Sequence, residues 1–237
     1  MTAAHLLGRR IFTQRLVFAL PLSLAAVRGR GRTAAASLQD SSSPQPGSAA
    51  PGAAGSTVLL VYFSRAGENY YYGDRIDLEV GNTKVVAGMI ADLTGCDVYE
   101  IEAADPYSDD YDAIVARNVE EQNAGARPAI ANPLSSIDAY AIIILGSPIW
   151  NVRPPMIMST FAERFDFTGK TVFPLVRYAV SGMGDTEREY QEACRNATFG
   201  EGLAIQGEDV TDAPGDVAAA VESWLRTIGL LDGAPAS

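Results

Sequence analysis

The feature that most constrains the fold is a regular alternation of short apolar runs with longer segments of helical periodicity. Residues 57–64 and 140–146 are apolar almost throughout, as expected of strands that are covered on both faces. Residues 83–94 place apolar side chains three and four positions apart, and Gly95 follows them as a helix C-cap. This alternation predicts a parallel sheet whose strands are joined by right-handed helical crossovers.

The strand–helix pair occurs five times along the chain. The pattern predicts further strands at 97–101, 171–180 and 199–205, and further helices at 111–122, 154–165, 186–194 and 217–228. Five units fit a doubly wound, three-layer sandwich with five parallel strands in the order 2-1-3-4-5. A ligand of such a sheet lies beyond the carboxyl ends of the strands, where the first and third strands part. The loops that follow Phe63, Leu145 and Ala179 should therefore converge on one site.

The N-terminal quarter of the chain has a different composition. Its 56 residues hold six of the 18 basic residues and one of the 29 acidic residues, which leaves 12 basic and 28 acidic residues from Thr57 onward. The resulting net charge of −16 argues against nucleic acid as a partner, because phosphates would be repelled. It suits docking to a basic protein partner, although acidity also serves solubility alone.

The first residues resemble an export signal. Arg9 and Arg10 with the next four residues resemble a twin-arginine motif, and residues 16–27 are apolar but too short for a permanent membrane span. We expect a signal peptide at 1–36, a Ser/Pro/Gly/Ala linker at 37–56, the folded domain at 57–231 and a flexible tail at 232–237. The signal implies a periplasmic, cell-wall or extracellular location. If translation starts downstream and the signal is not genuine, the protein is cytoplasmic.

The two cysteines are expected to be free. Cys96 opens a predicted strand and Cys194 ends a predicted helix, at opposite edges of the predicted sheet. That separation exceeds the reach of a disulfide, so two buried thiols are expected.

The loop after the first strand carries groups suited to phosphate. Ser64, Arg65, Ala66 and Gly67 follow the strand, and after an excursion Gly81, Asn82 and Thr83 lead into the next helix. A helix N-terminus offers unpaired N–H groups and the positive end of the helix dipole. Walker A and GxGxxG patterns are absent, which argues against nucleoside triphosphates and against a Rossmann-type NAD site. Thr83 could alternatively serve only as a helix cap.

The other two loops of the predicted site differ in character. The second is 146–151, where Trp150 could pack on a flat aromatic ligand or simply on the protein surface. The third is 178–185, where two glycines allow close backbone approach, as they also would in an ordinary turn.

Together these segments resemble the flavodoxin-like family of bacterial FMN-binding proteins. The resemblance rests on residues 61–69 with 81–83, on 105–107, Tyr111, 127–128, 146–150, 165–170, 181–184 and 202–205, and it spans 57 to about 230 in order. It implies FMN as the cofactor, electron transfer through it, and a redox partner protein or small electron acceptor. It implies a cofactor site formed by Ser64, Arg65, Ala66, Asn82, Thr83, Ser147, Pro148, Ile149, Trp150, Asn151, Ala179, Ser181, Gly182 and Gly184.

The chain departs from the family pattern at two places, and it carries an insertion that is found in one branch of the family. Asn151-Val152-Arg153 and Tyr178-Ala179-Val180 replace the residues usual beside the flavin, which leaves the redox potential and the substrate face open. Arg153 could stabilise a reduced, anionic ring or remain a solvated charge. Residues 68–80 interrupt the phosphate loop, as they do in one branch of the family. We expect this insertion to be a lid, with a decorative loop as the alternative.

The chain itself offers little catalytic chemistry. Its single histidine is His5, and no cluster has the spacing of metal ligands or of a nucleophile with its base. Redox work must therefore belong to a bound cofactor. Three functions stay open: an electron carrier, an NAD(P)H-dependent quinone or flavin reductase, and a flavin-free binding module.

Overall fold

The computed structural model describes residues 57–232. The predicted signal peptide and linker, and all but the first residue of the predicted tail, lie outside these residues. The main sheet is parallel and runs β4 (Asp97–Glu100), β1 (Val58–Tyr62), β5 (Ile142–Pro148), β6 (Thr171–Tyr178), and then two short strands, β7 (Thr198–Phe199) and β8 (Leu203–Gln206). Counting β7 and β8 as one interrupted strand gives the predicted flavodoxin-like order 2-1-3-4-5.

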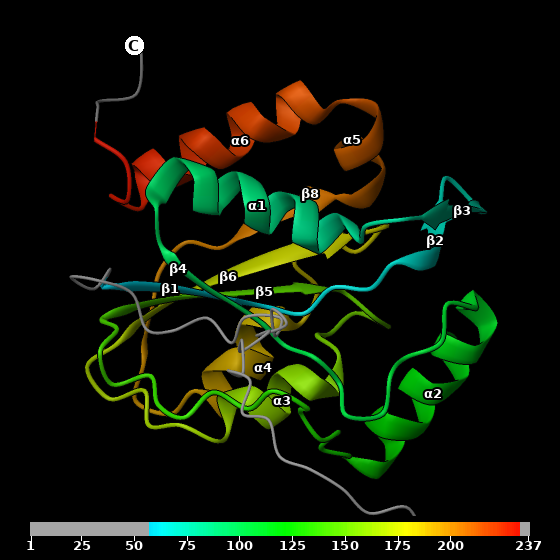
Figure 1. Ribbon diagram of the computed structural model, residues 1–237, viewed down its shortest axis with the longest axis horizontal. Coiled ribbons are helices and arrows are strands. Elements are labelled where there is room, and N and C mark those ends of the chain that lie inside the picture. The colour runs from blue at the N-terminus through cyan, green and yellow to red at the C-terminus, as the bar shows by residue number, and fades with distance from the viewer. Residues whose placement is uncertain (1–56, 233–237) are drawn as a thin grey trace, which may run out of the picture. The chain divides into compact units, whose positions relative to one another are not determined.

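Helices cover both faces of the sheet (Figure 1). One face carries α1 (Asn82–Thr94), α5 (Gly207–Asp212) and α6 (Pro214–Thr227). The other carries α3 (Met156–Ala162) and α4 (Thr186–Ala193), and α2 (Tyr111–Ala124) lies beside them. The short α5 was not predicted. Helix α3 is shorter than the predicted 154–165 helix: Pro155 is its N-cap, and it ends at Ala162.

The strands divide their side chains between two cores. Leu59, Val61, Ile143 and Leu145 join the cluster that includes Phe161 of α3. The alternate strand residues, such as Leu60 and Ile144, join a second cluster on the other face. That cluster includes Ile90 of α1 and Val221 of α6. Burial on both faces explains why these strands read as unbroken apolar runs.

The predicted last strand is interrupted where β6 contains a proline. Val172 O accepts a hydrogen bond from Gly200 N at 3.0 Å, so the backbone of Val172 faces the last strand. Pro174, two residues later, faces the same edge and has no N–H to donate. The ladder resumes at the pair Leu175 and Leu203. The strand therefore breaks where its neighbour lacks a donor.

The insertion is a β-hairpin. Strands β2 (Gly67–Tyr71) and β3 (Asp74–Leu78) pair antiparallel, and Tyr72 and Gly73 form the two-residue turn. Both turn residues have positive φ, 48° and 91°, as the favoured tight hairpin turns require. The insertion is thus an ordered element with a pair of strands of its own.

The expectation for the cysteines is confirmed. Cys96 and Cys194 are free and buried. Burial raises the pKa of the Cys194 thiol to about 12, so it stays protonated near neutral pH. Within residues 57–232, no helix combines the length and apolar content that a membrane crossing needs.

A buried lysine ties β6 to the connection that precedes β5. Lys170 is 8% exposed, and its Nζ donates to Ile137 O at 2.9 Å and to Tyr140 O at 2.7 Å. We expect Lys170→Met to lower the free energy of unfolding by about 2 kcal/mol, because both carbonyls lose a charged donor. Denaturant unfolding would measure the change. Lys84→Met, which removes an exposed ion pair with Glu100, is the control and should cost less than about 1 kcal/mol. Equal losses in the two variants would contradict this account.

Candidate flavin site

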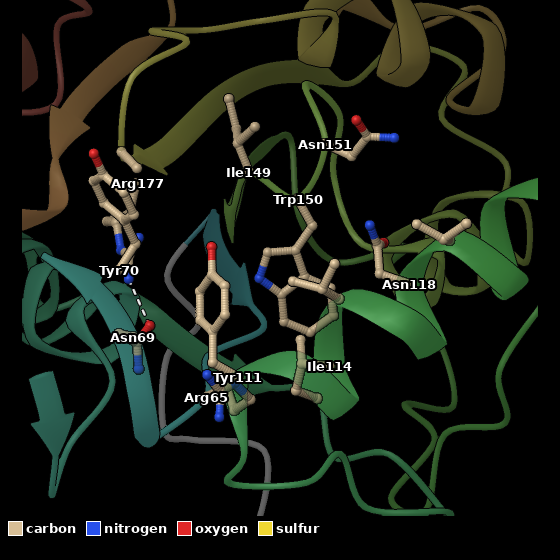
Figure 2. Close-up of a pocket in the computed structure, with 13 residues that line it drawn as sticks. Arg65, Asn69, Tyr70, Tyr111, Ile114, Asn118, Ile149, Trp150, Asn151 and Arg177 are labelled. Atoms are coloured by element: carbon tan, nitrogen blue, oxygen red, sulfur yellow. Dashed lines mark hydrogen bonds between the residues drawn. The ribbon is translucent and has the colours of Figure 1, made fainter. Parts of the chain in front are cut away.

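A cleft of about 320 Å³ opens at the carboxyl ends of the central strands (Figure 2). Its walls come from the loop after β1, the hairpin, α2, the loop after β5 and the end of β6. The lining residues are Arg65, Asn69, Tyr70, Tyr111, Ile114, Val115, Asn118, Val119, Ile149, Trp150, Asn151, Arg177 and Ala179. The cleft therefore lies at the switch point of the sheet, where the sequence analysis predicts a ligand site.

The loop after β1 packs closely against the start of α1. Ser64 Oγ accepts a hydrogen bond from Lys84 N at 3.1 Å. A Cβ built on Gly81 would stand 2.4 Å from both Ser64 Oγ and Arg65 O, so only glycine allows this approach. The sequence segments on either side of the insertion thus form one continuous loop in space.

The first turn of α1 keeps donors available for an anion. No hydrogen bond within residues 57–232 uses the backbone N–H groups of Asn82 and Thr83, and Gly81 contributes no side-chain cap. The Asn82 side chain is buried and donates from Nδ2 to Gly207 O at 2.7 Å, which fixes α1 to α5. A helix start with free N–H groups and neighbouring hydroxyls is suited to a phosphate.

Trp150 is held at the cleft by aromatic neighbours. Its ring centroid lies 5.2 Å from that of Tyr107 and 5.6 Å from that of Phe63, both edge to face. Gln122 Nε2 donates to Trp150 O at 2.9 Å, which ties the loop to α2. Burial and the neighbouring Glu121 raise the pKa of Tyr107, so this tyrosine stays neutral. Trp150 thus combines a half-buried ring with a fixed backbone.

The segment after Trp150 is a tight, strained turn. Asn151 and Val152 have φ of 52° and 63°, and Trp150 N donates to Arg153 O at 2.9 Å. Positive φ is costly for a β-branched residue such as Val152, whose side chain is 48% exposed. Val152 O accepts from Asp185 N at 2.7 Å, so this turn and the loop after β6 support each other. Strain of this kind is common at ligand sites.

The structure brings some of the predicted site residues to the cleft. Arg65, Ile149, Trp150, Asn151 and Ala179 line it, while Ser64 and Ala66 belong to the loop after β1 and Asn82 and Thr83 open α1 beside that loop. Ser147 does not reach the cleft, because its fully buried hydroxyl lies 3.3 Å from Tyr190 OH on the α4 side. Pro148, Ser181, Gly182 and Gly184 are also absent from the lining.

Two arginines named in the sequence analysis are engaged by groups of the protein itself. Arg153 pairs with Glu189 at 2.7 Å and does not line the cleft. Arg65 lines it, but its Nη atoms donate to the carbonyls of Ser108, Asp109 and Glu68. Burial lowers the pKa of Arg65, which nonetheless stays a cation.

The hairpin forms a wall of the cleft and is fastened on two sides. Asn69 and Tyr70 line the cleft. On one side Tyr71 OH donates to both oxygens of Asp212, and Tyr72 N donates to Glu208 Oε1. On the other side Arg75 pairs with Asp112 at 2.9 Å. The hairpin therefore spans from α5 to α2.

Sequence reasoning missed several residues of the cleft. Tyr111, Ile114, Val115, Asn118 and Val119 come from α2, whose sequence gives no sign that one face points to a ligand. Arg177 is different, because a charged residue inside the apolar run of β6 is a visible anomaly. It is 8% exposed, and burial lowers the pKa of its guanidinium. Residues 57–232 hold no group of His, Cys, Asp or Glu that could bind a metal.

Comparison with known proteins agrees with this geometry. No curated protein matches the chain. Among solved structures, a provisionally assigned flavoprotein of Bacteroides uniformis ATCC 8492 is 27% identical, with 73% of this chain and 99% of that one covered and a TM-score of 0.56. One of Bacteroides eggerthii DSM 20697 is 26% identical, with 72% and 96% covered and a TM-score of 0.55. A family model described as flavodoxin matches residues 78–223, and the chain therefore belongs to the flavodoxin family.

Proposed function

We propose that this protein binds FMN in the cleft and transfers electrons through it. One observation carries the proposal: an aromatic-walled cleft adjoins a helix N-terminus whose N–H groups are free. A flavin mononucleotide needs both parts, an apolar slot for its ring and donors for its phosphate. The volume of about 320 Å³ falls at the lower end of the range for ligand pockets.

The residues present fit FMN at both ends. Ser64, Thr83 and the amides that open α1 would hold the phosphate, and Trp150 with Tyr70 and Tyr111 would flank the ring. Bound FMN would supply one- and two-electron redox chemistry. The protein's own part is to hold, orient and shield the cofactor.

The surroundings of the cleft favour a carrier that docks on a basic partner. Exposed acids lie on the hairpin and at the start of α2, as Asp74, Asp77, Asp110 and Asp112 show. Part of the net charge of −16 that the chain carries from Thr57 onward therefore lies beside the cleft. Such a surface attracts a positively charged protein and speeds its encounter, and salt weakens the effect.

The carrier and the reductase differ in their donors and acceptors. We expect the chemically reduced, FMN-loaded protein to reduce cytochrome c, a basic one-electron acceptor, and to do so more slowly at high salt. We also expect little oxidation of NADH or NADPH when a quinone is added. Rapid NAD(P)H-dependent quinone reduction, with cytochrome c untouched, would replace the carrier with the reductase. Stopped-flow absorbance measures both reactions.

We propose in addition that the protein is exported after folding. The twin-arginine-like residues Arg9 and Arg10 support this proposal. N-terminal sequencing of the mature protein, with cleavage near residue 36, would support it. A mature chain that keeps residues 1–36 would contradict it.

A further inference from the structure

Arg177 is a buried cation with unused donors in the wall of the cleft. A guanidinium carries five N–H donors, and here Nη2 donates to Asn69 Oδ1 at 2.6 Å (Figure 2). No other hydrogen bond and no ion pair engages its side chain within residues 57–232. Its remaining nitrogens are not sealed in the core, because none is among the buried polar atoms without a partner. The side chain therefore offers donors to a ligand.

The position of Arg177 places these donors near the phosphate end of the site. Phe173 and Leu175 face the α1 and α6 side of the sheet, and Arg177, two residues later, follows the same alternation. Trp150 packs instead with the cluster on the opposite side. The side chain of Arg177 thus lies on the face of the sheet where α1 begins.

Close packing against Gly207 fixes the same placement. A Cβ on Gly207 would stand 2.7 Å from Arg177 Cδ and 2.9 Å from Cζ, so the side chain lies directly against this glycine. Gly207 O in turn accepts from Asn82 Nδ2, in the first residue of α1. One residue therefore separates the guanidinium from the helix start that would bind phosphate.

The local charges leave room for an anion. Arg65 lines the same cleft, and its charge adds to burial in lowering the pKa of Arg177. Glu208 acts in the opposite direction, but no ion pair joins it to Arg177, and its Oε2 has no partner. A buried cation that lacks a close counter-ion is costly, and a bound anion would offset that cost.

We propose that Arg177 is a phosphate-recognition residue, held by Asn69, that makes the site select the phosphate monoester of FMN over riboflavin. This inference rests on the proposed FMN binding and adds to it a residue for selectivity. A guanidinium forms paired, charge-assisted hydrogen bonds to phosphate oxygens, and riboflavin has no group to accept them.

The test compares FMN and riboflavin affinity in matched variants, measured by quenching of flavin fluorescence. We expect Arg177→Gln to weaken FMN binding roughly 10- to 100-fold and riboflavin binding less than about threefold. Arg177→Lys keeps the charge but not the planar fork, so its FMN affinity should fall between those of Gln and Arg. Arg188→Gln removes an exposed arginine of α4 and should leave both affinities unchanged.

A second measurement separates free phosphate from the FMN ester. Inorganic phosphate should weaken FMN binding to the unchanged protein without affecting riboflavin, and it should compete less well in Arg177→Lys. Equal losses for FMN and riboflavin, or no loss in either Arg177 variant, would overturn the role of Arg177 while FMN binding stands. If the unchanged protein binds neither flavin, the proposed function fails as well. If Arg177→Gln does not fold, the Lys variant and the phosphate competition decide.

Discussion

Gly81→Ala is expected to weaken FMN binding by at least about 100-fold while the domain stays folded. The added methyl group would meet Ser64 Oγ and Arg65 O at 2.4 Å and Arg65 C at 2.7 Å. Two of these atoms belong to the backbone, so the clash cannot be relieved by rotating a side chain. Overpacking of this kind costs about 1–3 kcal/mol, and relieving it moves the phosphate loop away from α1.

The measurement for Gly81→Ala is FMN titration together with thermal unfolding. Gly88→Ala is a matched control in the same helix, because a Cβ at Gly88 meets nothing within 4 Å. The control should keep its FMN affinity and gain about 0.5–1 kcal/mol, as glycine is unfavourable inside a helix. Undiminished FMN binding by Gly81→Ala would show that the close approach of the two loops is irrelevant to the cofactor.

Deletion of residues 68–80 is expected to have an effect of similar size. It removes Asn69 and Tyr70 from the wall of the cleft and takes away the hydrogen-bond acceptor of Arg177. The sheet should persist, because the hairpin is a separate two-stranded unit and because Gly81, which the deletion joins to Gly67, already packs against Arg65. We expect FMN affinity to fall by about 100-fold or more, since water would enter the open side and phosphate recognition would weaken.

Circular dichroism and FMN titration check the deletion. Asp77→Asn serves as its control, because it changes one exposed residue of β3 and keeps both strands. Unchanged FMN affinity in the folded deletion variant would show that the hairpin has no role in FMN binding, and it would contradict the lid hypothesis.

Much of the fold follows from the sequence because its strands are buried on both faces. The apolar runs at β1 and β5 are typical of strands in the middle of a covered sheet, and the five strand–helix units fit the observed strand order. The interruption between β7 and β8 depends on how Pro174 faces its neighbour, which requires the register of the sheet. Helix α5 has six residues and too few apolar positions to show a period.

The site was only partly predictable, because some of its residues are set by strand register and by how the helices dock. The loops after β1 and β5 follow buried strands directly, so Arg65 and Trp150 could be placed at the switch point. Ser147 could not be separated from its neighbours, since the direction of its side chain depends on strand register. The contribution of α2 depends on how that helix docks beside the hairpin, which local sequence does not determine. Arg177 was visible as a charge in an apolar strand, but its neighbours come from the hairpin and α5.

The most direct test of the account is the visible absorption spectrum of the purified protein after loading with FMN and removal of the excess. We predict flavin bands that correspond to about one FMN per chain. A folded protein that retains no flavin would contradict the proposed cofactor site and favour a flavodoxin-family module that binds partners without a flavin.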